Sequence, residues 1–189
     1  WPGREGEVTP VFVYTNYPTA ELFINGKSYG KQSKNNSSLK NRYRLMWMDT
    51  KYEPGEVKVV AYDKNGKAVA EKVVRTAGKP HHIELVSNRN ELTADGKDLA
   101  YVTVKVVDKD GNLCPADNRQ INFSVKGTGK YRAAANGDPT NLEQFHLQKM
   151  HAFNGMLTAI LQAGETAGEI VFTAKANGVK AGNIRIQTK

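Results

Sequence analysis

Short runs of alternating apolar and polar residues, separated by turn-forming residues, recur along the whole chain. The clearest run is ELFINGKSYG at 21–30, where two aliphatic residues flank Phe23 just before the Asn25-Gly26 pair. Asn-Gly is the strongest short-range signal for a β-hairpin, because a type I′ turn needs positive φ at both central residues. The pattern therefore predicts an antiparallel hairpin whose second strand begins at Lys27.

Further strands are expected wherever short apolar runs lie between Gly, Pro, Asn or Asp residues. In the first part of the chain these runs are 8–15, 43–50, 56–63 and 68–76. In the second part they are 82–88, 100–107, 120–125, 145–153, 155–162, 168–176 and 181–187. The run 155–162 (GMLTAILQ) has a helix-forming composition, but Gly155 opens it and its neighbours are β, so we predict a strand.

The stretch Ala77-Gly78-Lys79-Pro80 separates two series of such strands. Gly-Lys-Pro interrupts any strand, and a new alternating pattern starts directly after it. A chain of 189 residues has room for two domains of about 80 to 110 residues each. We therefore predict an all-β fold of two tandem immunoglobulin-like antiparallel β-sandwiches, formed by residues 1–78 and 79–189.

The composition is that of an ordinary globular protein, with 39% hydrophobic and 24% charged residues. No apolar run approaches the roughly 18 residues of a membrane span, and no signal peptide opens the sequence. The chain starts at Trp1 without an initiator Met, so we expect it to be a piece of a longer protein. Cys114 is the single cysteine, which excludes an internal disulfide and a cysteine-cluster zinc site, and we expect it to be buried and inert.

The net charge of +8 raises the question of nucleic-acid binding. The charge is spread along the chain, and only the segment 31–44 (KQSKNNSSLKNRYR) concentrates basic residues. The Asn and Ser residues at the centre of that segment are typical of a solvated loop between strands. We therefore expect no nucleic-acid partner.

The turn DKDGN at 108–112 contains part of a calcium-loop pattern. A full EF-hand loop needs further ligands, a Glu at its end and flanking helices, whereas β-type runs flank this turn. The segment AYDKNGKAV at 61–69 repeats the turn with one acidic residue fewer. We therefore predict a strand-connecting turn and no metal site, and the repetition suggests that the two domains share an architecture.

Candidate catalytic groups form no known constellation. A glycosidase needs two carboxyl groups about 5 to 9.5 Å apart on either side of one bond. The acidic residues lie in expected turns or at solvent-facing strand positions, and the four histidines do not form an HExxH pattern. The sequence also lacks a nucleophilic-serine elbow and a phosphate-binding glycine loop. We expect the chain to have no catalytic residue, no cofactor and no activity of its own.

Two segments carry a family resemblance. The stretch VFVYTNYPTAELFINGKSYGKQSK at 11–34 resembles the small β-sandwich that follows the catalytic barrel in β-galactosidase-like enzymes of glycoside hydrolase family 2. Residues 79–189 resemble the second accessory sandwich of the same enzymes, which is itself similar to invasin-type bacterial domains. The motifs that carry this second resemblance are 92–104, 136–139 (NGDP) and 153–155 (FNG).

The resemblance implies a function for the parent protein and not for this chain. The parent reaction would be the retaining hydrolysis of a terminal β-galactoside, with the catalytic pair in a barrel domain that is absent here. Residues 1–189 would be accessory scaffold, and their partners would be the catalytic barrel and the sugar-binding domains of the same parent chain. The resemblance also implies a periplasmic or secreted bacterial protein.

Two tryptophans are candidate carbohydrate contacts. In the family, tryptophans of the segment that follows the barrel lie close to the sugar pocket, so Trp1 is a candidate, with a surface-packed linker residue as the alternative. Trp47 lies between two methionines in an expected strand, where it is most simply the aromatic anchor of a core. Sugar stacking by Trp47 is the alternative role.

The segment Asn136-Gly137-Asp138 is the place where we expect a loop with a special role, because small residues precede it and a proline follows. In the structural interpretation, Asp138 bonds to its own backbone and fixes the loop. In the functional interpretation, the loop binds an ion or reaches the barrel and shapes the substrate entrance.

Two other function classes remain open at this point. The first is a carbohydrate-binding module, in which exposed aromatic residues would form a platform for glycan. The candidates for that platform are Trp47, Tyr14, Tyr43 and Tyr52. The second is an adhesin-like stalk, which is suggested only by the similarity to invasin-type domains.

Overall fold

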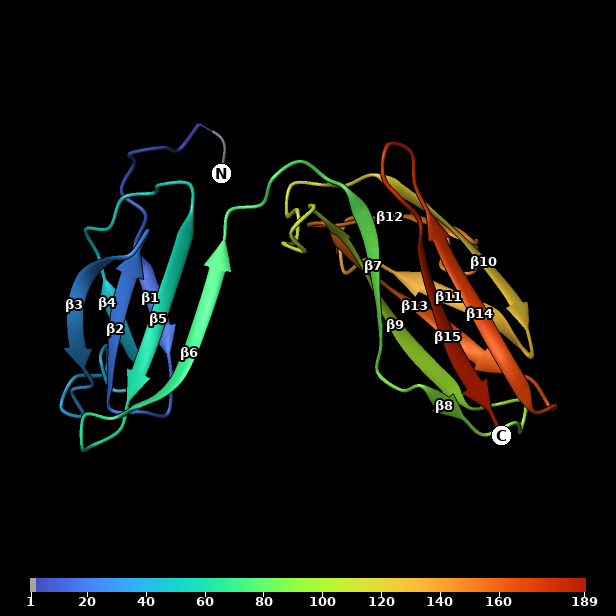
Figure 1. The fold of residues 1–189 in the computed structure, drawn as a ribbon, viewed down its shortest axis with the longest axis horizontal. Helices are drawn as coiled ribbons and strands as arrows, with labels where there is room; N and C mark the ends of the chain where they lie inside the picture. Colours follow the sequence, from blue (N-terminus) through green and yellow to red (C-terminus); the bar gives the residue numbers. More distant parts are fainter. Residues whose placement is uncertain (1–2) are drawn as a thin grey trace. The chain divides into compact units, whose positions relative to one another are not determined.

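The structure is a computed structural model that describes residues 3–189. Strands are the only regular elements in this part of the chain, which confirms the all-β prediction. The chain divides into two compact units, of which the first ends at Thr76 and the second comprises Ala77–Lys189 (Figure 1). Within the described residues, no helix is long and apolar enough to cross a membrane.

The first unit is built from two antiparallel sheets. Its strands are β1 (Val11–Tyr14), β2 (Thr19–Ile24), β3 (Lys27–Ser33), β4 (Arg44–Trp47), β5 (Glu56–Tyr62) and β6 (Ala68–Arg75). Four strands pair in the order β3-β2-β5-β6, and β1 pairs with β4 in a separate ribbon.

The predicted Asn-Gly hairpin is confirmed as β2 and β3. Asn25 has a φ of 49° and Gly26 a φ of 80°, so both central residues take the left-handed conformation that the turn requires. Ile24 pairs with Lys27 across the turn. The alternation along β2 places Ala20, Leu22 and Ile24 in the core of the unit, since successive side chains of a strand point to opposite faces.

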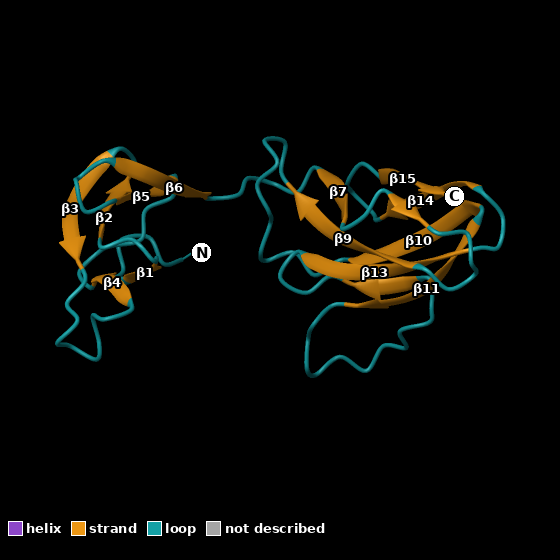
Figure 2. Ribbon diagram, turned by 90° about the horizontal axis from the view of Figure 1, so that it is seen from below, coloured by secondary structure: helices purple, strands orange, loops and turns teal. Residues whose placement is uncertain are grey.

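The second unit is a sandwich of two sheets. Its strands are β7 (His82–Ser87), β8 (Glu91–Leu92), β9 (Leu99–Val107), β10 (Gln120–Gly127), β11 (Gly129–Ala135), β12 (Lys149–His151), β13 (Met156–Ala163), β14 (Gly168–Lys175) and β15 (Gly182–Thr188). One sheet has the order β12-β10-β14-β15-β8 and the other β11-β13-β9-β7. Figure 2 shows them as two layers, with β10, β14 and β15 in one and β9, β13 and β11 in the other.

The core of the second unit lies between these two sheets. In β13 every second side chain is buried, from Leu157 to Ala163, which confirms that 155–162 forms a strand despite its composition. The turn before it is a second Asn-Gly turn, at Asn154-Gly155, where the Phe153 and Met156 backbones exchange hydrogen bonds. Strand β13 contributes buried residues that pack against those of the opposite sheet, including Phe172.

The structure corrects the sequence prediction at three places. Strand β11 is not among the runs expected from the sequence, because its sequence GKYRAAA has little apolar alternation. Residues 145–148 are not a strand, and only β12 forms in the expected run 145–153. Strand β8 is also not among the expected runs, and it pairs with β15 in parallel, so the second sandwich is not wholly antiparallel.

Candidate functional site

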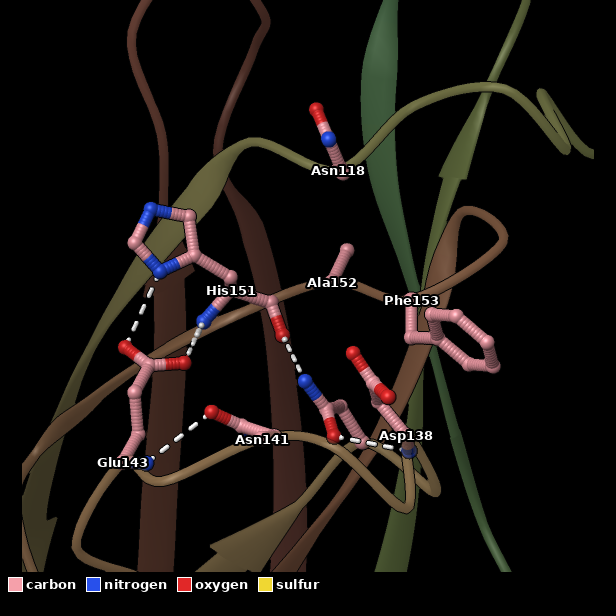
Figure 3. A pocket seen from close by; sticks show the side chains of 8 residues that line it. Asn118, Asp138, Asn141, Glu143, His151, Ala152 and Phe153 are labelled. Carbon is pink, nitrogen blue, oxygen red and sulfur yellow. Dashed lines mark hydrogen bonds and ion pairs between the residues drawn. The ribbon is translucent and has the colours of Figure 1, made fainter.

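A solvent-open cavity of about 350 Å³ lies at one end of the second unit. Figure 3 shows His151 at one end of this cavity and Phe153 at the other, with Ala152 between them. Its lining is Asn118, Asn136, Asp138, Asn141, Glu143, His151, Ala152 and Phe153. The lining is therefore rich in amide and carboxylate groups, and it includes two of the three residues of the predicted loop.

The long connection 136–148, which runs from the edge strand β11 to the edge strand β12 of the other sheet, supplies four of these residues. Tyr131 on β11 fixes this connection, because its hydroxyl donates to the carbonyl oxygens of Phe145 (3.1 Å) and Leu147 (2.7 Å). The Ala134 amide donates to the same Phe145 carbonyl at 2.8 Å. Burial raises the pKa of Tyr131 to about 12, so its hydroxyl keeps its proton at neutral pH.

The residues Asn136 and Asp138 form two successive side-chain turns. Asn136 Oδ1 accepts from the Asp138 amide at 3.0 Å, and Asn136 Nδ2 donates to the His151 carbonyl at 3.0 Å. Asp138 Oδ1 accepts from both the hydroxyl (2.7 Å) and the amide (2.8 Å) of Thr140, which together hold the pKa of Asp138 below its usual value. These bonds give the loop the backbone-fixing geometry of the structural interpretation.

Glu143 and His151 close one side of the cavity. Glu143 Oε1 lies 2.9 Å from His151 Nδ1, and Glu143 Oε2 accepts from the His151 amide at 3.0 Å. Burial alone would raise the pKa of Glu143, but the hydrogen bonds from His151 outweigh it and keep that pKa below its usual value. Glu143 is therefore a carboxylate at neutral pH and ties the loop to β12.

Asn118 reaches the cavity from the segment before β10. Its two neighbours are locked together, because the guanidinium of Arg119 donates to both carboxylate oxygens of Asp117, at distances from 2.6 to 2.9 Å. Arg119 also accepts from the Ala152 amide at 3.0 Å through its carbonyl. A bidentate pair of this kind is geometrically specific, so Asn118 stands on a fixed backbone opposite the loop.

The arrangement does not suit acid-catalysed glycoside cleavage. Such cleavage needs a general acid whose pKa is raised and a second carboxylate across the bond. The two carboxylates that line the cavity, Asp138 and Glu143, have lowered pKa values and already accept hydrogen bonds from neighbouring residues. Among residues 3–189, no group of three or more His, Cys, Asp or Glu side chains could hold a metal ion.

Of the two tryptophan candidates, the structure describes only Trp47, which lies in the first unit. Trp47 is only 5% exposed, and its Nε1 donates to the carbonyl oxygens of Tyr29 and Gly30, both at 3.2 Å. It packs in the core of the first unit, so its ring offers no open face to a sugar. Tyr14 and Tyr43 are 70% and 67% exposed. Trp1 lies outside the described residues.

The turn 108–112 has the structural geometry that its sequence suggested. The Oδ1 atom of the buried Asp108 accepts from the amides of Asp110 and Asn112, at 2.9 and 2.8 Å. Its Oδ2 accepts from the Gly78 amide at 2.7 Å. The Gly78 amide and the Asn112 side chain hold the pKa of Asp108 far below its usual value. This aspartate therefore fixes its own turn and the start of the second unit.

The sequence pattern singles out Asn136 and Asp138 but none of the other polar residues that line the cavity. Asn118 comes from a segment far away in the sequence, and its neighbours Asp117 and Arg119 resemble any charged turn. Glu143 and His151 are eight residues apart and meet only because the connection 136–148 folds back on β12. The one available signal is the motif Phe153-Asn154-Gly155 of the family resemblance, whose first residue lines the cavity.

Two family models match parts of the chain. Residues 83–185 match the model described as "Glycoside hydrolase family 2 C-terminal domain 5". Residues 6–70 match a model described as a domain of unknown function, DUF4982. The first match covers most of the second unit, including the whole cavity.

Known relatives are much longer than this chain. "Beta-galactosidase BoGH2A" from Bacteroides ovatus is 40% identical over 100% of this chain, which spans 22% of that protein. The solved structure of a glycosyl hydrolase family 2 member from Bacteroides cellulosilyticus is 32% identical, with a TM-score of 0.89 over 100% of this chain and 24% of its own. A beta-glycosidase structure from Bacteroides vulgatus is 28% identical, with a TM-score of 0.91 over 99% of this chain and 23% of its own.

Proposed function

The chain belongs to the glycoside hydrolase family 2 C-terminal domain 5 family, and from this premise we propose that it is a non-catalytic accessory region of a family 2 glycoside hydrolase. In this proposal the parent enzyme is of the β-galactosidase type and hydrolyses a terminal β-galactoside with retention of configuration. Residues 1–189 supply architecture beside its catalytic barrel, and the parent acts in carbohydrate degradation.

One observation carries the proposal. A protein named as a β-galactosidase aligns with the whole of this chain, yet the chain spans only 22% of that protein. A family 2 enzyme therefore has more than three quarters of its length available for the catalytic and substrate-binding parts. The chain therefore corresponds to a minor region of such an enzyme, and its family description names a C-terminal domain.

The chemistry of the cavity supports a non-catalytic role. Asp138 and Glu143 are ionised at neutral pH because hydrogen bonds stabilise their charged forms. A carboxylate without a proton cannot act as the general acid that protonates the leaving oxygen of a glycoside. The cavity therefore lacks half of the machinery that glycoside cleavage requires.

Outward-facing apolar side chains support contact with other domains of the parent chain. Leu142 is 96% exposed and Phe145 is 57% exposed, although the connection that carries them is hydrogen-bonded to β11 and β12. Exposed apolar side chains that form a contiguous patch mark an interaction surface, and Leu142 and Phe145 lie three residues apart in one connection. In the proposal this surface faces the catalytic barrel or the sugar-binding domains of the parent.

The proposal extends to the location of the parent. Relatives of this chain come from bacteria that include Bacteroides species. Polysaccharides are too large to enter a cell intact, so we place the parent enzyme in the periplasm or outside the cell. Fractionation of the source bacterium with an antibody to this chain tests that placement, and recovery in the cytoplasm alone contradicts it.

The accessory role is tested in a longer enzyme that carries this chain. Asp138→Ala and Glu143→Gln are introduced separately, and the kcat for a chromogenic β-galactoside is measured together with the melting temperature. We expect a lowered melting temperature with kcat within about twofold of the unchanged enzyme. A folded variant whose kcat falls by about a hundredfold would show that a cavity carboxylate takes part in the chemistry.

A further inference from the structure

The cavity of the second unit contains polar groups without partners. Asn141 Nδ2 is buried and has no hydrogen-bond partner in the structure. Within residues 3–189, the side chain of Asn118, the Asp138 Oδ2 atom and the His151 Nε2 atom also form no hydrogen bond. The Asn141 Nδ2 atom has almost no accessible surface, so it does not itself reach the open cavity. Asn118 and His151 are exposed, so their free side-chain atoms bond to water that a ligand can displace.

These groups surround one space. Figure 3 shows Asn118 on one side, Asp138 and Asn141 on the opposite side, and His151 at one end. Amide nitrogens are donors, the Asp138 oxygen is an acceptor, and an amide oxygen is a further acceptor. The cavity thus offers donors and acceptors together, which matches a ligand whose groups both donate and accept. Hydroxyl groups have this property, whereas a phosphate or a simple cation does not.

Phe153 adds an apolar element at the other end of the cavity. Its side chain is 37% exposed, so part of the ring remains open to a ligand. The C–H face of a sugar ring packs on an aromatic ring while its hydroxyl groups reach polar residues. A volume of about 350 Å³ lies at the lower end of the about 300 to 1,000 Å³ that is usual for ligand pockets. This size suits the end of a saccharide.

The charges of the site argue for a neutral ligand. Both carboxylates that line the cavity are ionised, and an anionic sugar would meet them at close range. A metal cation is disfavoured because Glu143 uses both oxygens on His151, and Asp138 uses Oδ1 on Thr140. One carboxylate oxygen is then left for the ligand, which is enough to bind a hydroxyl group.

From this geometry we propose that the cavity formed by Asn118, the loop 136–143 and 151–153 binds a neutral saccharide through its hydroxyl groups. The site is formed only by residues of the second unit, and it involves binding without bond cleavage. The inference goes beyond the accessory role, because an accessory region that bound no sugar would still be an accessory region. Its failure would therefore leave the proposed function unchanged.

The test is an NMR titration of the 189-residue chain with galactose, glucose, xylose and lactose in parallel. We expect at least one sugar to cause saturable shifts in backbone amides of 118, 136–143 and 151–153. Sodium glucuronate and calcium chloride serve as the anionic and cationic probes. No shift with any neutral sugar at about 50 mM, or shifts only at other residues, overturns the proposal. Shifts at these amides with calcium alone also overturn it.

Variants separate binding from folding. Asn118→Ala removes a side chain that forms no hydrogen bond among residues 3–189, so the fold is retained and the affinity for the sugar falls about tenfold. Phe153→Ala weakens binding to a similar degree. The matched controls are Asn90→Ala and Tyr101→Ala, two exposed residues outside the cavity, which leave the affinity unchanged. Equal affinities for Asn118→Ala and Asn90→Ala would overturn the assignment of the site.

Discussion

Asn25 joins two turns of the first unit. Besides its own Asn-Gly turn, it reaches the turn before β5, where its Oδ1 accepts from the Glu56 amide at 2.8 Å and its Nδ2 donates to the Pro54 carbonyl at 3.1 Å. Gly55 lies directly below this side chain with a φ of 134°. Any Cβ at position 55 would lie 1.9 Å from Asn25 Oδ1, so the contact itself selects glycine there.

Gly55→Ala should therefore destabilise the first unit strongly. The new methyl group clashes with Asn25 and the backbone stays at a φ that L-residues avoid, so we expect a loss of about 3 kcal/mol. The matched control is Gly26→Ala, where φ is also positive but no atom lies within 4 Å, and the loss is about 1 kcal/mol. Both tryptophans precede Ala77, so tryptophan fluorescence during urea unfolding reports on this unit. Equal losses of stability in Gly55→Ala and Gly26→Ala would contradict the predicted clash with Asn25.

Asp108 gives the second unit a pH-dependent stability. Its pKa is lowered in the fold, so its contribution is present above the unfolded pKa of about 3.9 and is lost as pH falls toward the lower folded value. Asp108→Asn removes the charge, so the variant is less stable at neutral pH and the difference shrinks as pH falls from about 6 to about 2. Urea unfolding followed by circular dichroism measures this difference.

The control for that comparison is Asp110→Asn in the same turn. The Asp110 carboxylate accepts no hydrogen bond from the described residues, and only its backbone amide is used, as a donor to Asp108. We expect its stability to match the unchanged chain across the pH range. A constant difference between Asp108→Asn and the unchanged chain from acid to neutral pH would rule out the ionised carboxylate as the cause.

The conformation of the connection 136–148 depends strongly on the side chain of Tyr131. The Tyr131 hydroxyl donates to two carbonyl oxygens of this connection, and its ring stacks on Phe123 in the core at a centroid distance of 5.6 Å. The connection contains no regular element of its own. Its order therefore depends on these hydrogen bonds and on the Glu143–His151 contact.

Tyr131→Phe should loosen this connection while the sheets remain intact. We expect a loss of about 1 kcal/mol and faster amide exchange at 136–148, because the Leu147 carbonyl loses the tyrosine donor and the Phe145 carbonyl keeps only the Ala134 amide. Hydrogen exchange measured by mass spectrometry localises the effect. Tyr101→Phe, at an exposed hydroxyl on β9, is the control and should leave the exchange unchanged. Faster exchange throughout the unit would contradict a local role.

The raised pKa of Tyr131 predicts that the second unit loses stability at high pH. Its pKa is raised to about 12 in the fold, against about 10 unfolded, so its contribution is present below pH of about 10 and is lost as pH rises through about 12. Phenolate absorbance should show Tyr131 titrating late, together with Tyr62, whose pKa is also raised by burial and by Glu21. The stability difference between the unchanged chain and Tyr131→Phe should shrink over this range.

Most of the strands were predictable because patterns of a few neighbouring residues specify them. Alternation in β2 and β13, and the Asn-Gly pairs before β3 and β13, specify strands and turns within a few residues. Strand β11 was missed because its short side chains carry no alternating pattern and its place is set by pairing with β13. The cavity was found only in part, since Asn118 and Glu143 reach it through tertiary contacts that no local pattern encodes.

At the scale of the whole molecule, each unit has a core of its own. The buried cluster of the second unit draws only on residues after Thr76, and that of the first unit only on residues before it. We therefore expect residues 77–189, expressed alone, to unfold cooperatively in urea. If residues 77–189 are unfolded when expressed alone, the two cores are not independent.

The family resemblance seen in the sequence is confirmed by the family match and by relatives that align along the full chain. The resemblance was predictable because each half of the chain has motifs of the family. The hairpin at 21–30 lies in the first half, and the NGDP and FNG segments lie in the second. The role within an enzyme was not predictable from physical patterns alone, because folds of this class serve many functions. The share of the relatives' length that the chain spans points to an accessory region, and so does the ionised state of the two cavity carboxylates.

The most direct measurement is a hydrolysis assay of the purified 189-residue chain with a chromogenic β-galactoside. The account predicts a rate equal to that of the buffer, because both carboxylates that line the cavity are ionised and neither can protonate a leaving oxygen. Turnover above the buffer rate that is abolished by Asp138→Ala or Glu143→Gln would contradict the account and place catalysis in this chain.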